Sequence, residues 1–322
     1  MKNRKLIGSG YALGKEIVSN EDFEKILDTS DEWIRSRTGI ETRRISPNEN
    51  SSDLAYRAAL MAIEHAKIAK EEIDLIIVAT ITPDNITPSC ACLIQDKLGL
   101  NEQKIMAFDV SAACTGFVYA LQIASYMLCE YQCALVVGVD VNSKLMDYTD
   151  RNTSILFGDG AGAVILKAQT CENEMIHYAN SSGDHEGFLI GKGLDLVKPL
   201  QNGNREIGYL SQNGSEVFRF AIKALEEAVI EVLKKANKTI EEIDYIIPHQ
   251  ANIRIIRNVA KRMKLSEDKF YTNLDKYGNT SGGSIPIALG EAIHQGVLKS
   301  GMKIIMVGFG GGFTYAATYI EL

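Results

Sequence analysis

Residues 71–77 read EEIDLII, and residues 241–247, 170 positions later, read EEIDYII. The apolar run ALVVG at residues 134–138 returns at the same spacing as IIMVG at residues 304–308. One such match would carry little weight, but two in the same register predict two related halves. The period is too long for a solenoid and leaves room for only two copies, so the chain is interpreted as an internal duplication.

Within each half, short Val, Ile and Leu runs alternate with amphipathic helical stretches, such as residues 52–66 and 215–235. This alternation is typical of helices packed on largely parallel sheets, and continuous apolar strands such as residues 75–79 would be buried on both faces. We therefore predict an α/β protein with five layers, α-β-α-β-α, and mixed sheets. The expected halves are residues 1–168, which carry the candidate nucleophile, and residues 169–322.

Charge and hydropathy exclude several classes of protein. The chain has 34 Lys and Arg against 41 Asp and Glu, a net charge of −7, which is unfavourable for binding a phosphate backbone. Its uninterrupted apolar runs fall far short of the ~20 residues that a membrane helix needs. The N-terminus begins with basic residues, but glycines interrupt its apolar run and Glu16 ends it, so we expect no secretory signal and a cytoplasmic location.

The six cysteines, at positions 90, 92, 114, 129, 133 and 171, are expected to be free thiols in a reducing cytosol. The pairs at 90 and 92 and at 129 and 133 lack the second Cys or His pair of a zinc site, so no metal is expected.

Cys114 is the candidate nucleophile. Residues 104–110 read as a strand, residues 111–116 as a turn of small residues, and a helix should begin near Cys114. A thiol at a helix N-terminus meets the positive end of the helix dipole, which predicts a lowered pKa and a reactive thiolate. The alternative is an inert, buried structural cysteine.

Two residues of the second half could act with Cys114. His249 stands where an apolar strand stops and a new helix begins, and the carboxyl ends of strands are where α/β folds place ligand chemistry. Asn279 lies in a small-residue loop, near the position equivalent to Cys114 in the repeat. The alternatives are a structural histidine and a turn or helix-capping asparagine.

Two glycine-rich segments, residues 158–162 and 308–312, could be mistaken for dinucleotide-binding loops. Both are followed by strand-like sequence rather than by a helix, so this interpretation is rejected. The second segment instead fits a backbone that approaches a reacting group and offers it an N–H.

With these features in place, the chain resembles the thiolase-like condensing enzymes, specifically the β-ketoacyl-acyl-carrier-protein synthase III family, nearly end to end. The Cys, His and Asn set separates this branch from elongating synthases, which carry a second His, and from thiolases, which carry a second Cys. The matching segments are residues 31–40, 51–55, 108–114, 157–162, 248–252, 278–281 and 308–312.

The resemblance implies a reaction. Cys114 would take an acyl group from acyl-CoA, with the oxyanion held by the backbone N–H groups of Cys114 and Gly311. Malonyl-acyl carrier protein would bind next, and His249 and Asn279 would donate hydrogen bonds to its thioester oxygen while CO2 leaves. Phe309 would help to exclude water. The chemistry would need no metal or redox cofactor, and CoA thioesters would be substrates.

The resemblance also implies an entrance and a homodimer. Trp33 and Arg151 would sandwich the CoA adenine, Arg37 would lie near its phosphates, and Asn252 would contact the pantetheine arm. A basic stripe beside His249 would dock the acidic carrier protein. Its residues are Arg254, Arg257, Lys261 and Arg219. Thr87, where many short-chain relatives carry Phe, would reach the acyl pocket of the neighbouring subunit and could deepen it.

Two alternatives remain open at this level. The same residues would serve a condensing enzyme of a specialised polyketide or quinolone-type pathway. A silent, carrier-binding scaffold is a third possibility, although retention of Cys114, His249 and Asn279 argues against it. Primer length and branching stay undetermined.

Overall fold

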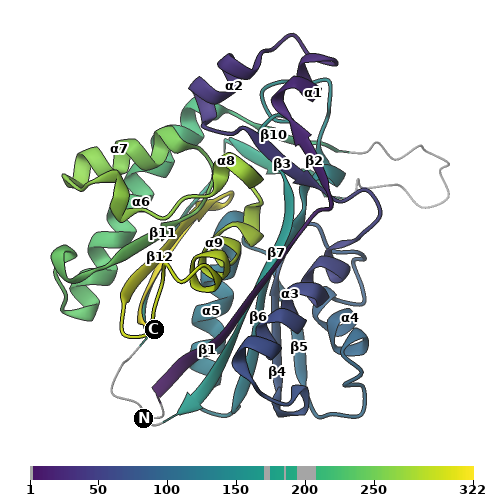
Figure 1. Cartoon of the computed structure of the whole chain (residues 1–322), viewed down its shortest axis with the longest axis vertical. Helices are drawn as coiled ribbons and strands as arrows, with labels where there is room; N and C mark the ends of the chain where they lie inside the picture. Colours follow the sequence, from purple (N-terminus) through teal and green to yellow (C-terminus); the bar gives the residue numbers. More distant parts are fainter. Residues whose placement is uncertain (1–2, 170–174, 185, 194–207) are drawn as a thin grey trace.

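The computed structural model describes residues 3–169, 175–184, 186–193 and 208–322, and it contains two stacked β-sheets with helices between and outside them (Figure 1). The first sheet has the strand order β1-β7-β6-β4-β5. Strands β6, β4 and β5 are mutually parallel, whereas β7 is antiparallel to both β6 and β1. Their bounds are β1 (Asn3–Leu13), β7 (Asp159–Gln169), β6 (Cys133–Val141), β4 (Leu75–Ala79) and β5 (Met106–Val110).

The second sheet repeats this pattern in the order β11-β12-β13-β8. Its first pair is parallel and the next two pairs are antiparallel. In the position equivalent to β5, a single bridge joins Phe270 to Ile246. The strands are β11 (Tyr245–Pro248), β12 (Lys303–Gly310), β13 (Phe313–Glu321) and β8 (Ile176–Gly183).

Three apolar clusters show how the layers stack. One lies between the outer helices α3 (Ser51–Ala66) and α4 (Cys90–Lys97) and the first sheet. The second surrounds α5 (Gly116–Met127) and α9 (Ser284–His294), which lie between the two sheets. The third joins the second sheet to α6 (Gly214–Ala236) and α7 (Ile253–Met263). The predicted five-layer fold is therefore confirmed.

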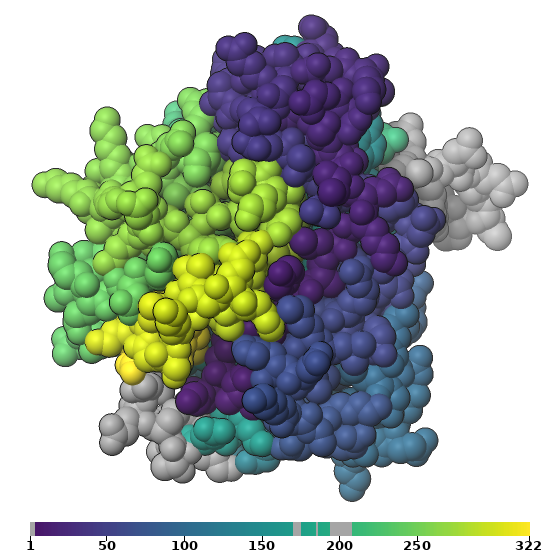
Figure 2. All heavy atoms as spheres, in the orientation of Figure 1, coloured from purple at the N-terminus to yellow at the C-terminus, as the bar shows by residue number. Residues whose placement is uncertain are grey.

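The remaining elements of the described residues are short. They are β2 (Glu16–Ser19), α1 (Asn20–Glu24), α2 (Asp31–Thr38), β3 (Thr42–Ile45), β9 (Leu189–Gly191), β10 (Leu210–Gln212), α8 (Leu274–Tyr277) and the 3₁₀ turns η1 (Lys70–Glu72), η2 (Ala113–Thr115), η3 (Asn142–Leu145), η4 (Ile240–Glu242), η5 (Glu267–Lys269) and η6 (Ser281–Gly283). Figure 2 shows the segment of α1 and α2 as a lobe at one end of the molecule.

Two glycines at equivalent places in the repeat let the halves interlock. A Cβ at Gly138 would lie 2.1 Å from the carbonyl oxygen of Gly282, and one at Gly308 would lie 3.4 Å from the carbonyl oxygen of Cys114. Each half thus uses a glycine in its central strand to admit the turn of the other half. This contact brings η2 and η6 together and positions the site.

The predicted division between residues 168 and 169 falls at the end of β7 and stays a prediction. Among the described helices, none is both long and apolar enough to cross a membrane. Five cysteines are free thiols: Cys90, Cys114 and Cys133 are buried, and Cys92 and Cys129 are exposed. Cys171 lies outside the described residues.

Candidate active site

A cavity of about 1030 Å³ is lined by residues of both halves. Its rim includes Trp33 and Arg254, and its inner wall includes Cys114, His249 and Asn279. These three inner side chains are 7%, 2% and 6% exposed. The cavity therefore connects exposed residues at its rim with three nearly buried side chains, the same three that the sequence predicts.

Cys114 lies in η2, directly before α5, as the sequence predicts. The preceding residue, Ala113, has a positive φ of 45°, a conformation that side chains other than glycine rarely adopt. Gly310 packs against the nucleophile, and a Cβ there would lie 2.8 Å from the backbone nitrogen of Cys114. The backbone of the second half therefore packs directly against the turn that carries the thiol.

The sequence predicts a lowered pKa for the Cys114 thiol, and this prediction is wrong. Burial raises the pKa to about 12, because the thiolate would lose its hydration there. The carboxylate of Asp140 acts in the same direction, and a hydrogen bond to Ser281 acts against it. Cys114 therefore rests as a neutral thiol and must give up its proton during any nucleophilic attack.

His249 follows β11 and is held by two contacts. The ring of Phe309 packs edge-on against it, with ring centroids 5.2 Å apart. Its Nδ1 lies 2.9 Å from the hydroxyl of Ser284, which also accepts the backbone N–H of Gln250 at 2.7 Å. Burial lowers the pKa of His249 to about 3, so the imidazole is neutral near pH 7.

The contact between Nδ1 of His249 and Ser284 serves either tautomer of the ring, because a hydroxyl offers one proton and two acceptor lone pairs. The family reaction requires a neutral ring whose proton is on Nε2, and in that tautomer Nδ1 accepts the proton of Ser284.

Asn279 is fixed through its backbone and its side chain. Its backbone N–H donates to the carbonyl of Leu156 at 2.8 Å, and its carbonyl accepts from Gly158 at 3.0 Å. Its Oδ1 accepts the backbone N–H of Ser281 at 2.8 Å, which leaves the amide Nδ2 as a donor.

The repeat aligns η6 with η2 and α9 with α5, so Gly282 is the structural equivalent of Cys114. Asn279 lies three residues earlier.

The glycine-rich turn lines the inner cavity with Gly310, Gly311 and Gly312. Gly310 makes the close approach to Cys114, whereas a Cβ at Gly311 would first meet the carbonyl oxygen of Leu189, at 3.4 Å. Gly311 is the residue predicted to supply an oxyanion N–H, and that role stays a prediction.

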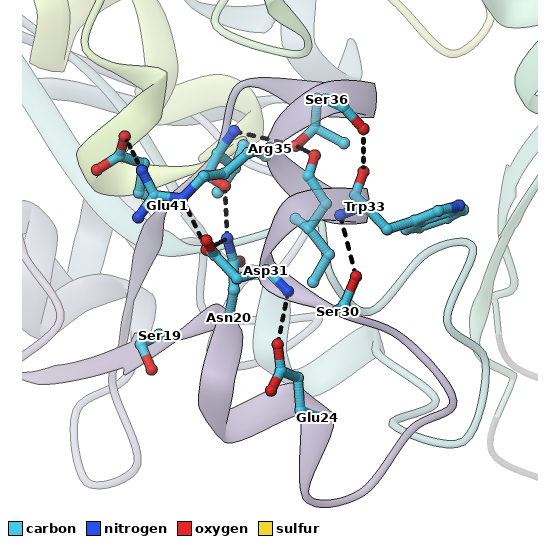
Figure 3. Close-up of polar contacts among 12 residues, drawn as sticks. Ser19, Asn20, Glu24, Ser30, Asp31, Trp33, Arg35, Ser36 and Glu41 are labelled. Carbon is cyan, nitrogen blue, oxygen red and sulfur yellow. Dashed lines mark hydrogen bonds and ion pairs between the residues drawn. The ribbon is translucent and has the colours of Figure 1, made fainter.

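The rim of the cavity carries Trp33 on α2. Figure 3 shows its ring directed away from the cluster that Arg35 forms with Asp31 and Glu41 on the other side of the helix. The guanidinium groups of Arg37 and Arg151 lie 5.7 and 5.3 Å from the centre of the Trp33 ring. Trp33 and Arg37 line the cavity. The fold thus brings together the three residues predicted to hold an adenine nucleotide.

Asn252 caps α7 and links it to α2. Its Oδ1 accepts the backbone N–H of Arg254 at 2.8 Å, and its Nδ2 donates to the carbonyl of Arg37 at 3.1 Å. Both polar atoms of the side chain therefore have partners already, and Asn252 also lines the cavity.

The four predicted docking cations differ in their surroundings. Arg254 and Arg219 line the rim, and Arg254 lies 5.7 Å from the centre of the Phe218 ring. Arg219 pairs with Glu216 and Arg257 with Glu267. Within the described part of the chain, Arg254 and Lys261 make no ion pair. Thr87 is exposed and is not part of this chain's cavity wall.

Sequence reasoning missed three polar residues of the site: Ser281, Ser284 and Asp140. Ser281 and Ser284 belong to the small-residue loop that carries Asn279, where repeated hydroxyls before a helix were the available signal. Asp140 follows the apolar run of β6 and is fully buried, and a charge at a strand's carboxyl end was its signal. The described residues contain no group of three or more His, Cys, Asp or Glu that could hold a metal ion.

A five-layer duplicated fold with Cys, His and Asn around one deep cavity defines a thiolase-like condensing enzyme. Two family models for 3-oxoacyl-[acyl-carrier-protein] synthase III match residues 108–183 and, for its C-terminal part, residues 233–322. The chain belongs to the β-ketoacyl-[acyl-carrier-protein] synthase III family, and it is an acyltransferase of the condensing type.

Individual relatives agree with this assignment. The chain is 51% identical to the β-ketoacyl-[acyl-carrier-protein] synthase III of Clostridium perfringens strain SM101, with all of both chains covered. The solved 3-oxoacyl-[acyl-carrier-protein] synthase III of Aquifex aeolicus superposes with a TM-score of 0.91 at 41% identity, covering 99% of this chain and 100% of that one. A priming β-ketosynthase from the R1128 polyketide pathway gives 0.89 at 31% identity, covering 100% and 96%.

Proposed function

We propose that this enzyme starts type II fatty-acid synthesis. An acyl group passes from acyl-CoA to Cys114, and a decarboxylative Claisen condensation with malonyl-acyl carrier protein then gives 3-oxoacyl-acyl carrier protein, with release of CoA and CO2. The observation that carries the proposal is the single cavity that connects Trp33 and Arg254 at the rim with Cys114, His249 and Asn279 inside.

The first half-reaction uses the turn around Cys114. The thiol attacks the thioester carbonyl, and the developing oxyanion is held by the backbone N–H groups of Cys114 and Gly311. An N–H donor that meets charge only in the transition state is worth about 3 kcal/mol. The contact of Gly310 with Cys114 supports this role, because it holds the glycine backbone against the nucleophile.

The second half-reaction uses donors from the second half of the chain. His249 through Nε2–H and Asn279 through Nδ2 donate to the malonyl thioester oxygen and stabilise the enolate formed as CO2 leaves. The resulting carbanion attacks the acyl group on Cys114. Phe309, packed on His249, keeps water from the carbanion. Loss of CO2 drives carbon–carbon bond formation, so the proposed chemistry uses no metal or redox cofactor.

The rim is proposed to bind the nucleotide end of CoA. Adenine would stack between Trp33 and Arg151, which requires Arg151 to move off the indole ring it now covers. Arg37 would pair with the phosphates. Asn252 would contact the pantetheine arm through hydrogen bonds additional to the two that it makes with Arg254 and Arg37.

Carrier-protein docking is proposed for Arg254, with Arg219, Arg257 and Lys261 as its neighbours. Arg254 is the strongest of the four candidates because it lies at the cavity rim without a carboxylate partner among the described residues. An unpaired guanidinium is available to the acidic surface of a carrier protein.

Arg254→Glu is expected to weaken use of malonyl-acyl carrier protein by about 10-fold or more, because it replaces attraction by repulsion at the docking surface. Acylation of Cys114 by acyl-CoA should change by less than about twofold. The two steps can be measured separately, by carrier titration and by acyl-enzyme formation. Lys234→Glu makes the same charge change on α6, where Lys234 pairs with Glu231, and serves as the matched control. Equal losses in both steps would argue against a docking role.

A homodimer is also proposed, with the open edge of β5 as its contact. Met106 of β5 is 45% exposed and Ile86, next to Thr87, is 79% exposed. An unpaired strand edge can pair with another chain, and apolar side chains gathered beside it mark a contact surface. Thr87 would then reach the partner's acyl pocket. We further propose a cytoplasmic location, in keeping with thioester substrates and free thiols.

A specialised pathway is the second candidate, favoured by the likeness to the R1128 priming synthase. The higher identity to the clostridial synthase favours fatty-acid synthesis.

Intact-protein mass spectrometry after exposure to a panel of acyl-CoAs tests both candidates. We expect one acyl group on Cys114, whose length and branching the panel identifies, and release of 3-oxoacyl-carrier and CO2 once malonyl-acyl carrier protein is added. Preference for an unusual starter would favour the specialised pathway. Acylation confined to the exposed Cys92 and Cys129, or no acylation, would refute the proposed function.

A further inference from the structure

Cys114 has a hydrogen-bonded neighbour that the family reaction leaves without a role. Its Sγ donates to the hydroxyl of Ser281, with the two atoms 3.6 Å apart. Ser281 also lies beside Asp140: its side chain lowers the pKa of that carboxyl, and the backbone N–H of the next residue, Gly282, donates to Asp140 Oδ2 at 2.8 Å. The hydroxyl of Ser281 therefore contacts the thiol and lies next to the carboxyl that Gly282 binds, and Cys114, Ser281 and Asp140 are all buried.

The carboxylate at the end of this chain is tightly held. Its Oδ1 accepts hydrogen bonds from the hydroxyls of Thr80 and Thr82 and from the backbone N–H of Ile81, at 3.1, 3.0 and 2.8 Å. Its Oδ2 accepts the backbone N–H of Gly282 at 2.8 Å. Two halves of the molecule thus orient one fully buried carboxylate, beside the turn that carries the nucleophile.

We propose that Ser281 and Asp140 form a proton relay that receives the thiol proton of Cys114 during acylation. As Sγ bonds to the thioester carbon, the thiol proton moves to the Ser281 oxygen, and the Ser281 proton moves to Asp140. When the tetrahedral species collapses, the electron pair leaves with the CoA sulfur. The proton returns from Asp140 through Ser281 to that sulfur, which is bonded to the same carbon. No proton is gained or lost overall.

Charge conservation favours this route over the alternatives. Moving the proton to Asp140 keeps the buried cluster at one negative charge, which shifts from the carboxylate to the reacting sulfur. Loss of the proton to water would leave two negative charges side by side in a dry site. Transfer to His249 would create a buried imidazolium, and burial already holds the pKa of that ring at about 3.

Burial also makes Asp140 a better base than an ordinary aspartate, since it raises the pKa of the carboxyl while the hydrogen bonds from Ile81, Gly282, Ser281 and Thr82 lower it. Asp140 is the charged group that acts on the Cys114 thiol, and His249 is the other titratable side chain on the inner wall of the cavity. The relay rests on the proposed acylation of Cys114.

Ser281→Ala is the sharpest test, with acyl-enzyme formation followed by rapid quenching and intact-protein mass spectrometry. The backbone N–H of Ser281 still donates to Asn279, and alanine is no worse than serine at the φ of 49° found there. We expect acylation to slow by about 100-fold or more, as for loss of a general base. Ser125→Ala deletes another buried hydroxyl, which contacts His177, and should acylate at the wild-type rate.

The pH dependence separates the relay from a structural role. Wild-type acylation should be nearly independent of pH while Asp140 is ionised, because the proton stays within the cluster. In Ser281→Ala only the thiolate can react. Since the thiol pKa is about 12, its rate should rise about tenfold per pH unit through neutral pH. The same tenfold rise in the wild type would overturn the relay.

Two further measurements close the test. Asp140→Asn should slow acylation to a similar extent, and the double variant should be no slower than either single one, because both remove one pathway. Condensation from acylated Ser281→Ala should proceed at the wild-type rate, and an equal loss in that step would contradict the relay. If the wild type is acylated and Ser281→Ala is acylated just as fast, only the relay is refuted. If the wild type is not acylated, the proposed function itself is refuted.

Discussion

Cys114→Ala is expected to abolish acyl transfer from acyl-CoA, lowering the rate by at least about 10⁴-fold, because no other described thiol lies on the inner wall of the cavity. The deleted sulfur is the atom that carries the acyl group between the two half-reactions, so overall turnover should fall with it. The measurement is the acyl mass gained by the intact protein, with the modified peptide identified.

Cys92→Ala is the matched control, since it removes an exposed thiol from α4 and should leave acylation unchanged. Mapping the modified peptide matters because Cys92 and Cys129 are exposed and will also react with alkylating reagents such as iodoacetamide. Turnover of Cys114→Ala at the wild-type rate would end the assignment of the nucleophile.

His249→Ala is expected to separate the two half-reactions. The variant should still be acylated on Cys114, but condensation with malonyl-acyl carrier protein should fall by about 10²- to 10³-fold, the usual cost of losing one donor to a developing oxyanion. Single-turnover release of CO2 from the acylated enzyme measures this step. Condensation at the wild-type rate would contradict the role of His249.

The pH profile of the same step checks the protonation state of His249. Because burial lowers the pKa of His249 to about 3, the ring would be doubly protonated only below that pH and stays neutral across the physiological range, as the proposed Nε2–H donor requires. Condensation by the wild type should therefore show no loss from His249 near pH 6.5, the usual histidine pKa. His65→Ala is the control, because His65 lies on α3 and contacts Ser9, away from the cavity.

Much of the fold could be predicted from sequence because it depends on local pattern. Helices α3 and α6 and strands β4 and β11 lie where the repeated segments predict them. The turn before α5 could also be predicted, since small residues between an apolar strand and a helix permit few other structures. One difference between the two sheets could not be predicted. The second sheet has a single bridge at Phe270 in the position that β5 occupies in the first sheet.

The site was predicted in its membership and mispredicted in its electrostatics. Cys114, His249 and Asn279 meet in one cavity as expected, but the thiol pKa moves up rather than down. The sequence reveals that Cys114 precedes a helix, and from this a dipole effect follows. It does not reveal how completely the other half excludes water from the sulfur, and that desolvation is the larger effect.

By itself, then, the order of residues determined a duplicated α/β fold and the kind of chemistry, because periodicity and residue type are local properties of the chain. Only the tertiary structure decided which groups are buried and which partners they contact. Ser284 contacts Nδ1 of His249, Ser281 accepts the hydrogen bond of Cys114, and burial keeps both reacting groups neutral. Hydrogen-bond partners and dehydration depend on atoms from distant segments, which come together only when the two halves interlock.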